Sequence, residues 1–163
     1  MIRPTLYALC LLFPLAARAE VKVGTPASDF DKSTRDGGHV KLSTLRGKVV
    51  LVDFWASWCE PCRREIPLLG KMAEKLRDRG VEIVTINIDD DAGKAERFLK
   101  DQGVKGLTVV RDDDKHIVAA YEPRTMPSSF VIDRKGVVRA VNAGFDDGDE
   151  RKIEQQLSAL AAR

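Results

Sequence analysis

Residues 49–62 read Val49-Val50-Leu51-Val52-Asp53-Phe54-Trp55-Ala56-Ser57-Trp58-Cys59-Glu60-Pro61-Cys62. The beginning of this stretch is short, apolar and rich in β-branched residues, which predicts a strand buried on both faces. From Ile66 onward apolar residues recur at helical spacing and Gly80 supplies a stop, so we expect a helix over 60–79. Cys59 therefore lies where a buried strand gives way to a helix.

Two cysteines at this spacing and position can interconvert between a dithiol and a disulfide. The unpaired N–H groups and the dipole of a helix N-terminus favour a thiolate at Cys59, and a thiolate is the attacking species. Pro61 fits the first helical turn, which tolerates a missing N–H. Cys62 lies about one turn further and is better shielded, which suits the resolving role in which it attacks a mixed disulfide.

A zinc site and a purely structural disulfide are the alternatives to redox chemistry. Zinc needs two further ligands. Beyond the two cysteines, residues 20–163 offer only His39 and His116, which have no paired ligand spacing. A hydrophobic core of this size rarely needs a disulfide for stability. We therefore expect no metal and no cofactor other than the redox-active Cys59–Cys62 pair, and we assign both histidines to surface or turn positions.

The segment from Trp55 to Pro67 resembles the active-site segment of the thioredoxin superfamily, and more narrowly that of its TlpA/ResA-like extracytoplasmic branch. The string W-C-x-P-C-[KR]-x-E-x-P is highly specific, and the likeness continues almost to the C-terminus. The resemblance implies reduction of disulfides in other proteins, which in several members serves cytochrome c maturation or copper-site assembly.

The same resemblance suggests four substrate-binding residues. Met126-Pro127 looks like the segment that carries a cis-proline, and the Met126 backbone would then pair with an extended substrate strand. Met126 and Trp58 would form an adaptable apolar rim. Gly144 resembles the glycine of the facing loop that lets a substrate backbone approach. The alternative for all four is ordinary loop packing.

Two acids are candidate proton carriers. Asp53 lies within an apolar strand, where a carboxylate costs free energy unless it is protonated or paired, and it could accept the proton of Cys62. Thioredoxins carry an aspartate at this position and a lysine where this chain has Thr85, so we expect the pKa of Asp53 to rise further. Glu65 matches a glutamate of the TlpA/ResA-like family and is ranked second. The alternatives are a solvent-facing Asp53 and a Glu65 that only serves the helix dipole.

Glu60 bears on the direction of electron flow. A negative side chain beside the Cys59 thiolate opposes it, and a less stabilised thiolate makes a more reducing couple. We therefore expect a reductase of protein disulfides, recharged by a membrane electron donor. The alternatives are a disulfide oxidase or isomerase on the same fold, a copper-site assembly factor, and a non-enzymatic partner-binding module.

The N-terminus resembles a targeting segment. Arg3 precedes an apolar run from Leu6 to Ala17, and Ala17-Arg18-Ala19 looks like a signal cleavage site. We expect a secretory signal peptide at 1–19, containing Cys10, and one thioredoxin-like domain at 20–163. The alternative is an uncleaved membrane anchor, for which the run is short.

The expected mature chain is close to neutral. When Arg3 and Arg18 leave the 27 basic residues, 25 basic residues remain against 25 acidic ones. This balance argues against nucleic acid as a partner. We expect a periplasmic or extracytoplasmic monomer whose partners are proteins bearing disulfides or cysteine pairs.

Strand and helix patterns alternate along the chain and predict a thioredoxin fold of the α/β class. It would be a three-layer α/β/α sandwich with a mixed central sheet, an N-terminal β-hairpin turning at Gly37-Gly38, and a helix–strand insertion at 92–111. Further elements are expected at 81–88, 114–121, 128–133, 137–143 and 147–162. The runs Asp89-Asp90-Asp91 and Asp112-Asp113-Asp114 are expected to be solvated loop ends and helix starts.

Overall fold

The computed structural model describes residues 21–163, so the expectations for residues 1–19 lie outside the described residues. Its main sheet has five strands in the order β5-β4-β3-β6-β7. Strand β3 is parallel to β4 and antiparallel to β6, which confirms the mixed sheet. The strands are β3 (Val49–Trp55), β4 (Val81–Asn87), β5 (Thr108–Arg111), β6 (Ser128–Ile132) and β7 (Val138–Ala143).

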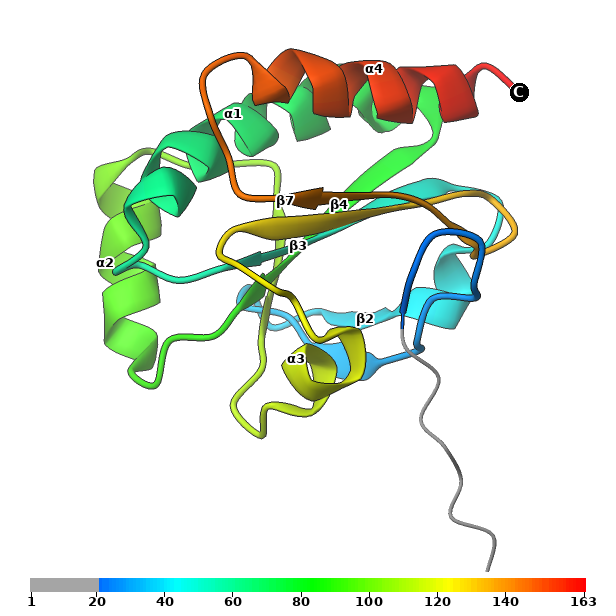
Figure 1. Cartoon of the computed structure of the whole chain (residues 1–163). Helices are drawn as coiled ribbons and strands as arrows, with labels where there is room; N and C mark the ends of the chain where they lie inside the picture. Colours follow the sequence, from blue (N-terminus) through cyan, green and yellow to red (C-terminus); the bar gives the residue numbers. More distant parts are fainter. Residues whose placement is uncertain (1–20) are drawn as a thin grey trace, which may run out of the picture.

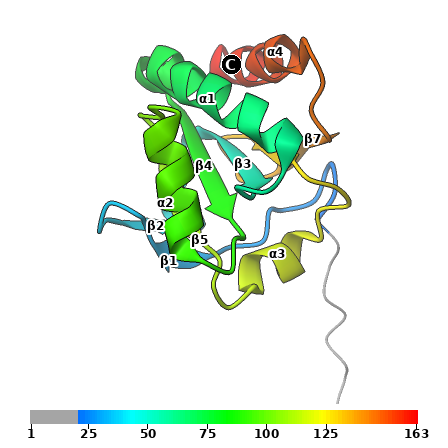
Figure 2. The ribbon, with the colours of Figure 1, turned by 90° about the vertical axis from the view of Figure 1, so that its left-hand side faces the viewer.

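Helices cover both faces of this sheet, as a three-layer sandwich requires. Helices α1 (Glu60–Leu76) and α4 (Asp149–Ala161) lie together on one face (Figure 1). Helix α2 (Ala92–Asp101) packs beside α1 at the β4–β5 side (Figure 2). The opposite face carries α3 (His116–Tyr121) and the hairpin of β1 (Asp31–Ser33) and β2 (His39–Lys41). Short 3₁₀ helices complete the fold at Leu42–Leu45 and Arg77–Arg79.

Strand β3 is buried along its whole length, as its apolar sequence predicts. Its side chains alternate between two hydrophobic cores. Leu51 and Trp55 belong to the core beneath α1, α2 and α4, whereas Val52 and Phe54 belong to the core beneath α3. The alternation places Asp53 on the α1 side of the sheet, among the residues of the first core. The fold therefore brings a carboxyl group under the helix that begins after Cys59.

Helix boundaries differ from the predicted ones at glycines with left-handed backbone. Helix α1 ends at Leu76, and the 3₁₀ turn that follows leads to Gly80, whose φ is 74°. Gly148 has a φ of 98°, so α4 begins at Asp149 rather than at residue 147. Glycine adopts this backbone region without the steric cost that other residues meet.

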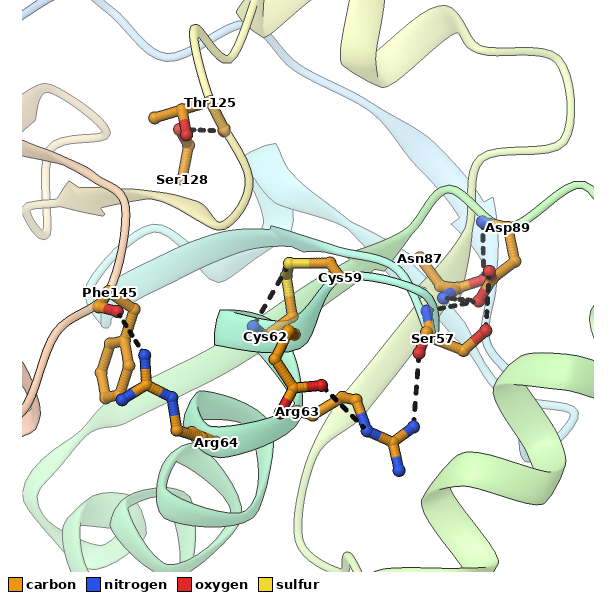
Figure 3. Close-up of a disulfide and its surroundings, with 11 residues drawn as sticks. Ser57, Cys59, Cys62, Arg63, Arg64, Asn87, Asp89, Thr125, Ser128 and Phe145 are labelled. Carbon is orange, nitrogen blue, oxygen red and sulfur yellow. Dashed lines mark hydrogen bonds and ion pairs between the residues drawn. A yellow bond between two sulfur atoms is a disulfide. The ribbon is translucent and has the colours of Figure 1, made fainter.

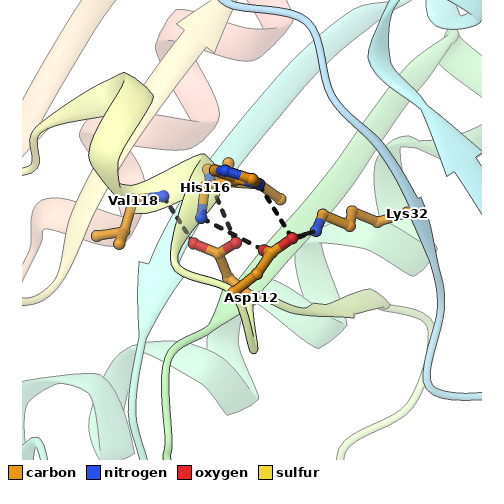
Figure 4. Close-up of polar contacts among 6 residues, drawn as sticks. Lys32, Asp112, His116 and Val118 are labelled. Atoms are coloured by element: carbon orange, nitrogen blue, oxygen red, sulfur yellow. Dashed lines mark hydrogen bonds and ion pairs between the residues drawn. The ribbon is translucent and has the colours of Figure 1, made fainter.

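The expectation of solvated aspartates at residues 112–114 is wrong for Asp112, which is 1% exposed. Its Oδ1 accepts a hydrogen bond from the Ile117 backbone N–H at 3.0 Å, and its Oδ2 accepts one from Val118 at 2.7 Å (Figure 4). Burial is tolerated because the first turn of α3 supplies both donors. His116, exposed as expected, contacts the neighbouring Asp114. Within residues 21–163 no helix has the length and apolarity to cross a bilayer.

The central position of β3 predicts a large cost for truncating its core side chains. Leu51 is fully buried, and Leu51→Ala is expected to lower the free energy of unfolding by about 2–5 kcal/mol, because a cavity adds to the lost transfer free energy. Urea unfolding measures this change. Val141→Ala, at a position 40% exposed, is the control and should cost less than about 1 kcal/mol. Equal costs for the two variants would contradict the central role of β3.

Candidate active site

Cys59 and Cys62 form a disulfide at the N-terminus of α1, with Cα atoms 5.3 Å apart. Cys59 caps the helix with an extended backbone, and its Sγ accepts a hydrogen bond from the Cys62 N–H at 3.2 Å (Figure 3). Cys59 is 5% exposed, whereas Cys62 is completely buried. An incoming sulfur can therefore reach Cys59 first.

The charged residues of the first helical turn interact with each other. Glu60 is the first helical residue and Pro61 follows it, so the missing proline N–H removes no helical hydrogen bond. The Glu60 carboxylate lies 3.8 Å from Arg63 Nε. The Arg63 guanidinium also donates to the Ser57 carbonyl oxygen at 3.4 Å and lies over the ring of Phe98. The sequence analysis missed this role of Arg63, although the i,i+3 spacing to Glu60 indicates an ion pair.

The loop before β6 and the loop after β7 meet in the surroundings of the disulfide (Figure 3). The Met126–Pro127 peptide bond is cis, as the resemblance implied. Ser128 Oγ donates to the Thr125 carbonyl oxygen at 2.7 Å. Gly144, with a φ of 82°, donates its N–H to the Pro127 carbonyl oxygen at 2.8 Å. The sequence-predicted proline and glycine are thus in direct contact.

Two of the predicted rim residues present apolar surface. Trp58 is 65% exposed and immediately precedes Cys59. Met126 is half-buried and packs against both hydrophobic cores. An exposed tryptophan beside an accessible sulfur can supply contact area for a partner.

The two predicted acids are both buried, which excludes a solvent-facing Asp53. Asp53 is 0% exposed and neither carboxyl oxygen has a hydrogen-bond partner. Burial raises the pKa of Asp53 well above its ordinary value, and the Glu65 carboxyl raises it further. Glu65 is 1% exposed, with Oε2 unpartnered. Burial, assisted by the charge of Asp149, raises the pKa of Glu65 to about 8.

Thr85 lies directly opposite Asp53 in the parallel pairing of β3 with β4. Its hydroxyl is buried and has no hydrogen-bond partner. Within residues 21–163 no cation pairs with Asp53. The structure therefore holds the Asp53 carboxyl in its neutral form over a wider pH range than a solvated aspartate.

The expectation of solvated aspartates at residues 89–91 is wrong for Asp89, which is only 3% exposed. Its carboxylate accepts hydrogen bonds from the Ser57 N–H at 3.0 Å, the Ser57 hydroxyl at 2.9 Å and the Asn87 side-chain amide at 2.8 Å (Figure 3). These donors replace water around the charge. The network fixes the backbone two residues before Cys59. Its sequence signal is the pair of polar residues Asn87 and Asp89, at and just after the end of β4.

The part of the chain that the structure describes contains no group of three or more histidine, cysteine, aspartate or glutamate side chains placed to hold a metal ion. The chemistry that the described site offers is that of the disulfide and of the two buried acids, Asp53 of β3 and Glu65 of α1.

Comparison with known proteins places this arrangement in a family. The AhpC/TSA family model matches residues 23–141. The thiol-disulfide oxidoreductase ResA of Geobacillus thermodenitrificans is 32% identical over 88% of this chain and 80% of its own length. A Chlorobium tepidum structure described as the thiol:disulfide interchange protein DsbE is 38% identical, with a TM-score of 0.80 over 87% of this chain and 99% of that chain. A Bacteroides thetaiotaomicron structure described as a protein disulfide isomerase is 31% identical, with a TM-score of 0.79 over 88% and 92%.

The fold and the Cys59–Cys62 disulfide define a thiol–disulfide oxidoreductase with a thioredoxin fold. The chain belongs to the AhpC/TSA family, in the thioredoxin-like group that includes the ResA proteins.

The raised pKa of Glu65 predicts a pH-dependent effect of Glu65→Gln on stability. The folded protein holds the Glu65 proton up to about pH 8, whereas a solvated glutamate releases it near its ordinary value of 4.5. Wild-type stability should therefore fall as the pH rises between these values, because the folded state binds more protons. A neutral glutamine avoids this loss, so the variant should gain stability over the wild type as the pH rises from 5 to 8.

Urea unfolding of the oxidised proteins at pH 5 and pH 8 measures the difference. Glu60→Gln is the matched control, because the Glu60 side chain is 81% exposed, and its effect should change little with pH. A stability difference between Glu65→Gln and wild type that is the same at both pH values would contradict the raised pKa.

Proposed function

We propose that this protein reduces disulfides in other proteins outside the cytoplasm. The Cys59 thiolate attacks a substrate disulfide and forms a mixed disulfide, releasing one substrate thiolate. Cys62 then attacks the Cys59 sulfur, releases the second substrate thiolate and leaves the Cys59–Cys62 disulfide. The substrate gains two electrons and the dithiol loses two. The observation that carries this assignment is the accessible Cys59 beside a fully buried Cys62.

The second step requires a proton acceptor, since Cys62 attacks as a thiolate. Asp53 and Glu65 are the two candidates, and both lie on the α1 side of the sheet with unpartnered oxygens. We assign the proton of Cys62 to Asp53 first, with Glu65 as the coupled second acid. The pair then returns the proton as the dithiol is regenerated.

The direction of electron flow rests on the charges around the dithiol. Relatives carry names of an interchange protein and of an isomerase, so names alone do not decide it. Glu60 lies in the first turn of α1. The negative Glu60 side chain opposes a thiolate nearby, and a less stabilised thiolate makes the dithiol a better reductant. Arg63 offsets part of this effect by pairing with Glu60.

The proposed substrate is a protein with an extended segment around its disulfide. The Met126 backbone would pair with that segment, Trp58 and the Met126 side chain would contact its apolar groups, and Gly144 would leave room beside Pro127. The signal-like pattern at residues 1–19 supports an extracytoplasmic location and, with it, a membrane electron donor. The protein would act on these partners as a monomer.

The division of roles between the cysteines predicts different outcomes for their serine variants. Cys62→Ser should accumulate a mixed disulfide with a protein substrate such as insulin, because Cys59 attacks but nothing resolves the product. Cys59→Ser should form this adduct more slowly, because its remaining thiol, Cys62, is completely buried. Non-reducing electrophoresis and mass spectrometry measure the trapped species. A double serine variant that keeps the cellular role would instead favour a non-enzymatic binding module.

The Glu60 argument predicts the sign of a change in reduction potential. Glu60→His removes a negative charge beside Cys59 and should raise the potential by about 20 mV, since a charge at a helix N-terminus contributes about 1 kcal/mol. Equilibration with dithiothreitol or glutathione measures the potential through the fluorescence of Trp55 and Trp58. Glu74→His is the control, because Glu74 is exposed further along α1.

The wild-type value tests the direction itself. A potential near or below about −270 mV supports a reductase, whereas a value near −120 mV would indicate an oxidant. An unchanged or lowered potential in Glu60→His would refute the role assigned to Glu60.

A further inference from the structure

A row of buried polar side chains crosses the sheet at Asp53. Asp53 lies opposite Thr85 of β4 on one side and opposite Ser129 of β6 on the other. Ser129 in turn lies opposite Asn142 of β7. Residues opposite one another in a sheet share a face, so all four side chains lie beneath α1 and α4. Four polar residues in one register position are unusual in a sheet whose other buried positions are mostly apolar.

The row is hydrogen-bonded at one end only. Asn142 Nδ2 donates to Ser129 Oγ at 3.2 Å and to Gln156 Oε1 of α4 at 3.1 Å, and Gln156 Nε2 donates back to Asn142 Oδ1 at 3.3 Å. Ser129 is 2% exposed. Both oxygens of Asp53 and the hydroxyl of Thr85 have no partner. In this oxidised protein the Ser129 hydroxyl is therefore turned toward Asn142 and makes no hydrogen bond with Asp53.

We propose that Ser129 is a positioning residue that donates a hydrogen bond to Asp53 when the aspartate is ionised, and that Asn142, held by Gln156, competes for the Ser129 hydroxyl. This inference rests on the proposed function, in which Asp53 accepts the proton of Cys62.

The geometry permits this exchange through one side-chain rotation. Side chains directly opposite in an antiparallel pair have Cβ atoms about 4.5–5.5 Å apart, so a serine hydroxyl that turns toward its neighbour comes within hydrogen-bond distance of a carboxylate. Serine rotates freely about χ1, whereas the branched side chain of Thr85 is restricted in a strand. The Ser129 oxygen accepts from Asn142, which leaves its own hydrogen available.

The chemical consequence follows from the charge on Asp53. A neutral carboxyl needs no donor from Ser129, but a carboxylate at this buried position gains a donor that replaces water. The step moves one proton from Cys62 to Asp53 and back and consumes no other reactant. The titratable group that acts on Asp53 is Glu65 of α1, and Asp149 of α4 acts in turn on Glu65. Cys62 belongs to the hydrophobic core on the same side of the sheet. At the positions directly opposite along the row, the neighbouring strands supply hydroxyl and amide groups.

Titration of the Asp53 carboxyl carbon by NMR tests the proposal in the oxidised full-length protein, where the cysteines do not titrate. A Glu65→Gln background removes the coupled acid. Ser129→Ala should raise the Asp53 midpoint by about one to two pH units, the size expected for losing one hydrogen bond to a charged group. Asn142→Leu should lower the midpoint, because the Ser129 hydroxyl is released toward Asp53.

Two further variants separate positioning from packing. Ser129→Thr keeps the hydroxyl but restricts its rotation about χ1, so the midpoint should stay raised as in Ser129→Ala. Thr108→Val removes a hydroxyl that bonds to Glu82 elsewhere in the sheet and should leave the midpoint unchanged. An Asp53 midpoint that does not move in Ser129→Ala would overturn the role of Ser129, and one that does not move in Asn142→Leu would overturn the competition.

The pH profile of insulin reduction, measured with Glu65 present, should shift upward in Ser129→Ala together with the NMR midpoint. If wild-type protein reduces insulin at no pH, the proposed function fails, whatever the titration shows. If reduction occurs but its profile is the same in both proteins, the positioning role in the reaction fails while the proposed function stands.

Discussion

A carboxyl group without a hydrogen-bond partner lies in the middle of the central strand, and the redox site is arranged over it. Asp53 is tolerated there because the protein can keep it neutral, so the free energy of burying a charge is not incurred in the oxidised state. In a more polar or solvated position the pKa of Asp53 would not be raised by burial, and its protonation would no longer depend on the state of the dithiol. The buried position thus exchanges some folding stability for a group that responds to protons.

The surrounding structure holds the two cysteines in different environments. Strand β3 is fixed by neighbours on both sides, and Asp89 fixes Ser57 immediately before the helix. The chain can therefore turn into α1 at one defined point, with Cys59 slightly exposed and Cys62 completely buried. Arg64 adds a second attachment, since it donates to Asp147 and to the Phe145 carbonyl oxygen and so ties α1 to the loop after β7.

Local sequence patterns predict most of the fold and the centre of the site, because strand burial, helix periodicity and the CxxC spacing act over short distances. The cis bond before Pro127 came from a resemblance and is present. Asp89 and Asp112 were misassigned because their partners are backbone and side-chain donors that the fold brings to them. The Ser129–Asn142 contact depends on strand register, which single residues do not encode. The stacking of the Arg63 guanidinium on the Phe98 ring depends on where α2 packs. The predicted roles of the site residues stay predictions.

The disulfide joins residues only three apart in sequence. A cross-link that closes so short a loop restricts the unfolded chain by only about 2 kcal/mol on the chain-entropy model. The two apolar cores on either side of the sheet, rather than this bond, account for the integrity of the domain. The molecule can therefore open and close its own covalent link many times without unfolding, which repeated turnover demands of a catalyst whose reagent is a pair of its own side chains.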